Sequence, residues 1–457
     1  MKNANALIRI VFIYINFSYI FSYLIFPFKT KKSIIDDTEH NMTRLFRSLL
    51  YNNIYIKLEI GEPKQKVTAF LVSKFIDYYF SEKAKNNSRT NISNPDLEDV
   101  GCQLDEFFDK YDSKSLEITS KLKTLYDSKG FVSYDYLYFK DENNGKIEKK
   151  LKFILYENTL GNRPAVVGLQ FPRFKEEFNI FNILKENDII NSYVWMINYT
   201  SQNEGNFIIG EHPHKIDPIN YKEVDLLIGH PFTYKAMQEL WGLRMDDILF
   251  NGENFRPNHE CYFYHELNFI QGIDYLEKEI DKFLNDSFNN NTCFKNNIKY
   301  PYGPHIFYYC DKEKYKENMQ YFPPLKFIHI EMNYTFELTY EDLFIEKYDK
   351  LILLIFFEER GSTWKLGKPF LKKYPFIMNQ DAKIVSYYQK FGNPKQDDGG
   401  NNIYYITIAL ISVGIMILIV LGIFIGKYLF KKKKRLNTLD DEYEYTEGNK
   451  DEKIIIN

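Results

Sequence analysis

The sequence predicts a mostly β fold with a few short helices, followed by one transmembrane helix. Apolar and polar residues alternate over 54–60, as in a half-buried strand. A turn with Gly61 and Pro63 leads into a second apolar run over 67–72, so the pair is predicted to form a β-hairpin. Residues 403–425 carry no charge and are long enough as a helix to span a bilayer.

The length and composition of the chain limit the number of domains and the kinds of partner that we expect. The chain has 457 residues, which suffices for two sizeable domains and tails, and its formal net charge is −3. This balance gives no reason to expect a nucleic acid partner. Aromatic residues make up 17% of the chain, which suits a protein built of strands. We expect no cofactor and no metal site, because the histidines are scattered.

The N-terminus has the pattern of a secretory signal peptide, predicted over 1–28. Lys2 and Arg9 accompany the start of an apolar run over 10–26. No clear cleavage site with small residues follows, so an uncleaved signal anchor is the alternative.

Basic residues after the apolar segment orient the chain in the membrane. Lys427 and the run 431–435 follow at once, and such residues face the cytoplasm. We therefore expect a single-pass type I membrane protein, with its ectodomain outside the cell or in an endomembrane lumen. The predicted parts are a juxtamembrane linker at 393–402, the transmembrane helix at 403–426 and a cytoplasmic tail at 427–457.

Seven N-x-S/T sequons lie between the two apolar segments, which agrees with this orientation. The candidate glycosylation sites are Asn41, Asn86, Asn91, Asn198, Asn285, Asn290 and Asn333.

Four cysteines, Cys102, Cys261, Cys293 and Cys310, allow three pairings, and the sequence does not choose among them. The closed loop is shortest for Cys293 with Cys310, so these two are the disulfide candidates. They flank much of an Asn- and Tyr-rich stretch, 289–309, that we interpret as an insertion.

The predicted hairpin resembles the opening of a pepsin-like aspartic protease. In that family a strand, the motif G-x-P-x-Q and a second strand lead into D-T/S-G, the first catalytic loop. Gly61, Pro63 and Gln65 match this motif. Further motifs that resemble the family, up to about residue 390, lie at 165–169, 195–199, 205–210, 241–252, 325–338, 364–376 and 380–388.

The residues before the first catalytic loop match the family, but the loop itself lacks the family's D-T/S-G residues. Counting from Gly61, the catalytic Asp position holds Val72, with Ser73 for the Thr or Ser and Lys74 for the Gly. The flap of the family carries a tyrosine at its tip. Tyr126 is the candidate here, although it comes three residues late.

The second catalytic loop is equally degenerate and has two possible registers. Counting back from Gly272, which should open a helix, the Asp position is Tyr264; counting forward from Cys261, it is Glu266. We prefer the first register, because the Cys spacing varies within the family. His265 and Glu266 are adjacent, and neighbours on a strand point to opposite faces, which argues against an acid–base pair.

The resemblance implies a bilobal fold, with lobes at 51–197 and 198–392 after a short pro-like segment at 29–50. Proteolysis in this family needs two carboxylates that share a proton. We therefore expect a catalytically inactive member that binds a peptide or protein in the cleft between the lobes. The alternatives are an active aspartic-type endopeptidase with a non-standard dyad, and a membrane receptor or scaffold.

Overall fold

The computed structural model describes most of the predicted ectodomain. The described residues are 23–31, 42–51, 53–73, 78–81, 106–125, 128–140, 145–156, 165–170, 178–210, 221–225, 241–255, 258–300, 303–358, 363–388 and Lys427. The chain divides into two compact units, 1–392 and 393–457, and everything below concerns the first. No helix within the described residues is long and apolar enough to cross a membrane, and the predicted span at 403–426 lies outside them.

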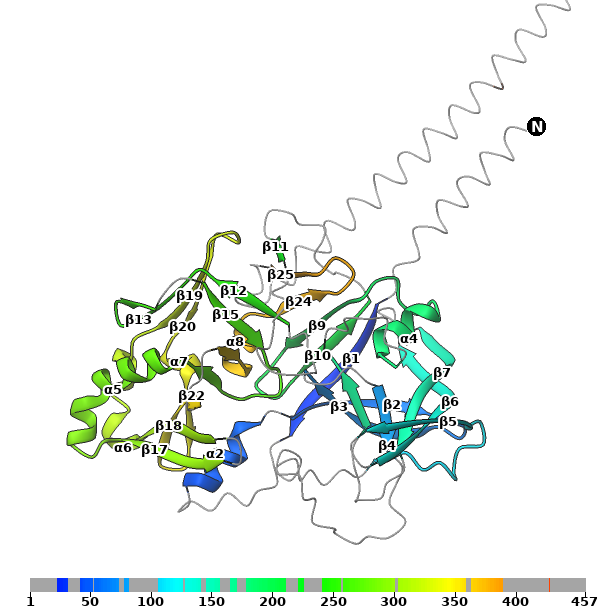
Figure 1. Cartoon of the computed structure of the whole chain (residues 1–457), viewed down its shortest axis with the longest axis horizontal. Helices are drawn as coiled ribbons and strands as arrows, with labels where there is room; N and C mark the ends of the chain where they lie inside the picture. The colour runs from blue at the N-terminus through cyan, green and yellow to red at the C-terminus, as the bar shows by residue number, and fades with distance from the viewer. Residues whose placement is uncertain are drawn as a thin grey trace, which may run out of the picture. The chain divides into compact units, whose positions relative to one another are not determined.

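The described part of the chain is mostly β, as predicted (Figure 1). The largest sheet contains, in spatial order, β11 (Tyr221–Asp225), β25 (Ile384–Tyr388), β24 (Phe376–Asn379), β9 (Val194–Tyr199), β10 (Glu204–Ile209), β1 (Leu24–Lys31), β2 (Asn53–Ile60), β3 (Gln65–Val72), β8 (Ala165–Gly168), β4 (Tyr78–Ser81), β7 (Lys146–Tyr156), β6 (Ser128–Lys140) and β5 (Glu117–Leu125).

Two smaller sheets come from the second half of the chain. One contains β12 (Gly242–Met245), β15 (His259–Phe263), β23 (Trp364–Leu366), β16 (Ile270–Gly272), β22 (Lys350–Glu358), β18 (Gly303–Asp311) and β17 (Cys293–Tyr300), with β21 (Phe344–Lys347) beside β22. The other contains β14 (Glu253–Asn254), β13 (Asp247–Phe250), β19 (Leu325–His329) and β20 (Tyr334–Leu338). The helices are α2 (Met42–Leu50), α4 (Ile180–Glu186), α5 (Asp274–Asn289), α6 (Lys312–Tyr315), α7 (Tyr340–Leu343), α8 (Lys368–Lys373) and the 3-10 helix η1 (Met319–Tyr321).

The strand order reveals an internal repeat. We call β2-β3-β8-β4-β7-β6-β5 the N-terminal block and β12-β15-β23-β16-β22-β18-β17 the C-terminal block. In both blocks the successive pairings are antiparallel, parallel, antiparallel, parallel, antiparallel and antiparallel. The strands also follow the same order along the chain, so the two blocks are copies of one topology.

The predicted first hairpin is confirmed as β2 and β3. The alternating residues of β2 are buried on the core side, as the pattern requires. Gly61 has φ +82° in the turn, and a Cβ there would lie 2.7 Å from the Ser113 Oγ atom. Both the backbone angle and the close approach therefore require glycine at this turn.

The predicted boundary between the lobes, 197/198, lies inside β9, which a hairpin turn connects to β10. The Thr200 N–H donates to the Glu204 carbonyl at 3.0 Å. Strand β9 also pairs with β24, so C-terminal strands join the same sheet as the N-terminal block (Figure 1).

Residues assigned above to the signal peptide and the pro-like segment belong to the fold. Strand β1 pairs with β10 and β2, and its Leu24 and Phe28 are buried in the main core. Helix α2 packs in a second apolar cluster with residues of the C-terminal block. A boundary after Phe28 would divide β1, so the folded chain begins earlier than the predicted domain division.

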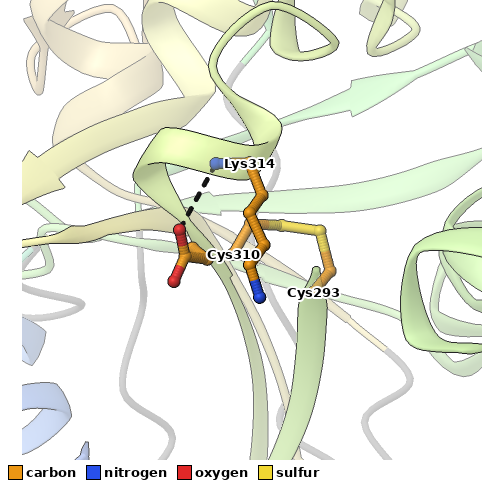
Figure 2. Close-up of a disulfide and its surroundings, with 4 residues drawn as sticks. Cys293, Cys310 and Lys314 are labelled. Carbon is orange, nitrogen blue, oxygen red and sulfur yellow. Dashed lines mark hydrogen bonds between the residues drawn. A yellow bond between two sulfur atoms is a disulfide. The ribbon is translucent and has the colours of Figure 1, made fainter. Parts of the chain in front are cut away.

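The stretch interpreted as an insertion is instead part of the repeat. Its strands β17 and β18 hold the places in the C-terminal block that β5 and β6 hold in the N-terminal block. The predicted disulfide between Cys293 and Cys310 is confirmed and joins directly paired residues of this hairpin. Figure 2 shows the bond beside α6, where the Lys314 N–H donates to the Asp311 carboxylate at 3.3 Å. Cys261 is a free, buried thiol.

Candidate functional site

The repeat identifies which residues of the two predicted catalytic loops are equivalent. Val72, the last residue of β3, lies opposite Gly168 of β8. In the C-terminal block Phe263 lies opposite Leu366, so the next residue, Tyr264, comes level with Gly367. Tyr264 is therefore the counterpart of Val72, in agreement with the register counted from Gly272.

Backbone contacts hold both loops tightly. In the N-terminal block the Leu169 N–H donates to the Val72 carbonyl at 2.9 Å, and in the C-terminal block the Tyr264 N–H donates to the Leu366 carbonyl at 2.9 Å. A Cβ on Gly367 would lie 2.2 Å from the carbonyl oxygen of Phe269. The close approach of these backbones explains why a glycine follows the apolar strand here.

The two loops meet at buried polar residues. The His265 N–H donates to the Ser73 Oγ atom at 3.4 Å, and the Ser73 N–H donates to the Glu266 Oε2 atom at 3.4 Å. All three residues are buried. We call Ser73, His265 and Glu266 the loop junction. Because Ser73 follows Val72 and His265 follows Tyr264, the first of these hydrogen bonds joins equivalent positions of the two blocks.

His265 of the loop junction and the preceding residue, Tyr264, favour uncharged states. Burial lowers the pKa of His265 to about 3, so the imidazole is neutral at and above mildly acidic pH. Burial raises the pKa of Tyr264, whose phenol therefore stays protonated. Val72 has no ionisable group. The two equivalent loop positions thus hold no pair of carboxylates that could share a proton.

His265 and Glu266 do not lie on a strand, and the reasoning that placed them on one was wrong. They form a turn closed by the Leu267 N–H, which donates to the Tyr264 carbonyl at 3.1 Å. The His265 ring lies against the Trp195 ring, with centroids 5.7 Å apart. The turn therefore sends the imidazole towards an aromatic neighbour and the Glu266 carboxylate towards Ser73.

Sequence reasoning missed an ion cluster beside Tyr264. Lys365 Nζ lies 3.1 and 3.2 Å from the two Glu358 carboxylate oxygens, and His305 Nε2 lies 3.4 Å from Oε1. Burial alone would raise the pKa of Glu358, but His305 and Lys365 together outweigh it and lower this pKa to about 2. Lys365 Nζ also lies 5.7 Å from the centre of the Tyr264 ring. His305, Glu358 and Lys365 come from three different strands, so no local motif could reveal the cluster.

Helix α2 is a second feature that sequence reasoning missed. Its Phe46 stacks on Phe307, with ring centroids 4.5 Å apart, in the cluster that also contains Tyr264. The Asn268 Nδ2 group donates to the carbonyls of Leu49 and Tyr51, at 2.7 and 3.0 Å. The segment expected to be pro-like is therefore held on the C-terminal block next to its loop.

The remaining predicted site residues are distributed as follows. Lys74 and Tyr126 lie outside the described residues, as do the sequons at Asn41, Asn86 and Asn91. Asn198 is half-buried in β9, whereas the other three sequon asparagines are exposed: Asn285, Asn290 and Asn333. Within the described ranges, no three His, Cys, Asp or Glu side chains are grouped so that they could hold a metal ion.

The chain matches no protein-family model and no curated protein sequence.

Proposed function

We propose that this chain is a membrane-anchored, catalytically inactive protein with a bilobal pepsin-like fold, and that it acts by binding a peptide or protein. The observation that carries this proposal is the pair of equivalent positions Val72 and Tyr264. Neither supplies a carboxylate where the repeat brings the two loops together. The single-pass anchor at 403–426 is part of the proposal.

The main support for the fold is agreement between motifs and topology. The motifs at 165–169, 241–252 and 364–376 include β8, β12 and β23 of the repeat, whereas those at 195–199, 205–210, 325–338 and 380–388 fall on strands outside it. Two copies of one topology, each contributing one loop to a shared junction, suit a bilobal protein with a site between its halves.

The chemistry argues against the family's reaction. One carboxylate must take a proton from water while its partner gives one to the scissile carbonyl. Loss of one member of such a pair typically costs several orders of magnitude in rate. Here both equivalent positions are replaced, so we expect no turnover by this mechanism.

An active endopeptidase is the second candidate, and Glu266 is the observation that favours it. This carboxylate is buried at the loop junction, two residues after Tyr264. A rebuilt site around Glu266 would need a second acid that the described residues do not place within hydrogen-bond distance of it.

The deciding experiment is cleavage of a denatured protein substrate by the purified chain between about pH 3 and pH 7, with and without pepstatin. The proposal expects no turnover. Turnover that Glu266→Gln abolishes would support the endopeptidase. Pepstatin-sensitive turnover that survives Glu266→Gln would mean that both catalytic loops are wrongly assigned.

A further inference from the structure

We propose that the Glu266 carboxylate is an anchor for a cationic group, the ammonium or guanidinium of a lysine or arginine side chain in a bound peptide. This inference rests on the proposed function and specifies the class of ligand that its site takes.

The carboxylate of Glu266 is unusual because it is buried and only partly satisfied. Glu266 is 8% exposed. Its Oε2 atom accepts one long hydrogen bond, 3.4 Å from the Ser73 N–H. Its Oε1 atom is buried and has no hydrogen-bond partner in the described part of the chain. A carboxylate removed from water without a partner is costly, so such a group calls for a ligand.

The groups around Glu266 do not supply the missing positive charge. His265 is neutral because its pKa is lowered to about 3 by burial. Tyr264 is a neutral phenol. Lys365, the lysine over the Tyr264 ring, donates to both oxygens of Glu358. The described part of the junction therefore offers the Glu266 carboxylate no cationic partner.

Buried aromatic side chains pack on the His265 side of the junction. The Trp195 ring contacts His265, and its Nε1 donor is buried without a partner among the described residues. Trp241 lies 5.6 Å from Trp195 and donates to the Leu169 carbonyl. The small exposed fraction of Glu266 suits a slender side chain that ends in its charge.

Glu358 provides an internal comparison. It is a partly buried carboxylate of the same residue type, but it pairs with His305 of β18 and Lys365 of β23. The chain thus satisfies one of these two glutamates from within, whereas Glu266 is left for a group from outside.

The first test is a selection of phage-displayed random twelve-residue peptides on the purified chain at neutral pH, with Glu266→Gln as the matched control. The amide keeps the shape of the side chain and removes its charge. We expect the wild-type chain to enrich peptides with Lys or Arg at one fixed position. Replacing that residue by norleucine should weaken binding about tenfold to the wild-type chain and little to Glu266→Gln, because a charged hydrogen bond is lost only in the first case.

The outcomes separate this inference from the proposed function. Peptides that bind without a basic preference, or with the same preference to Glu266→Gln, would overturn the role of Glu266 and leave the peptide-binding function standing. If neither chain binds any peptide, the proposed function itself fails.

A second test needs no ligand and compares two identical substitutions. Glu266→Gln should raise the Tm of the free chain by about 2 °C, because it removes an unpaired buried charge, whereas Glu358→Gln should lower it. Lys74, next to Ser73 in the sequence, is the alternative source of a cation. If it pairs with Glu266, the Tm of Glu266→Gln will fall as well, and the inference is overturned.

Discussion

The N-terminal and C-terminal blocks share one strand order but differ where their loops meet. The first loop begins at Val72, which is half-buried. The second begins at Tyr264, which is buried in a cluster with residues of α2. The last hairpin of the C-terminal block is crosslinked by Cys293 and Cys310. The shared strand topology therefore depends on backbone pairing and on close contacts at glycines. The side chains at the equivalent positions Val72 and Tyr264 can differ without loss of that topology.

The largest loss of stability should come from adding a side chain at Gly367, where two backbone segments of the C-terminal block lie close together. Gly367→Ala should lower the free energy of unfolding by about 4 kcal/mol, because a Cβ there meets carbonyl oxygens of the backbone, which cannot move aside cheaply. Urea unfolding of the purified chain, followed by tryptophan fluorescence, measures this.

Gly252→Ala is the matched control for that substitution. Gly252 has φ +80°, but a Cβ would have no atom within 4 Å, so this change tests backbone strain alone and should cost about 1 kcal/mol. If the two variants lose equal stability, steric crowding at Gly367 is not the reason that this position requires glycine.

The next effect concerns the hairpin that distinguishes the C-terminal block. Replacing Cys293 and Cys310 together by Ala should cost about 3 kcal/mol, because the crosslink closes a loop of 17 residues in the unfolded chain. Thermal unfolding with and without reductant should show sensitivity to reductant in the wild-type chain and none in this variant. Cys261→Ala should keep that sensitivity; its loss there would place the crosslink elsewhere.

The smallest effect is the pH dependence of the stability that Glu358 contributes in the C-terminal block. The pKa of Glu358 is about 2 in the folded chain and near 4.5 ordinarily, so its contribution is present above about pH 4.5 and is lost as the pH falls towards 2. Between pH 5 and pH 2 the wild-type chain should lose about 1 kcal/mol more stability than Glu358→Gln, a value that partial exposure keeps small. Equal slopes for both chains would show that Lys365 and His305 do not stabilise the carboxylate.

Local patterns predicted much of the framework. Alternation predicted β2, and the turn with Gly61 and Pro63 leads into β3 as expected. Features that depend on distant segments were missed or misread. The stretch 289–309 has no local sign of being a repeat of β5 and β6, and Leu24 has none of being a sheet residue instead of part of a signal peptide.

Residue types and spacing were sufficient to predict that Val72 ends the first hairpin, since it follows Gly61 at a set distance along the chain. In the second half of the chain they left two possible counterparts of Val72, Tyr264 and Glu266. That choice depends on the register of β15 against β23, which hydrogen bonds set between strands far apart in the chain. The unpaired oxygen of Glu266 and the paired oxygens of Glu358 likewise follow from which strands become neighbours, because an ion pair forms between side chains that folding brings together.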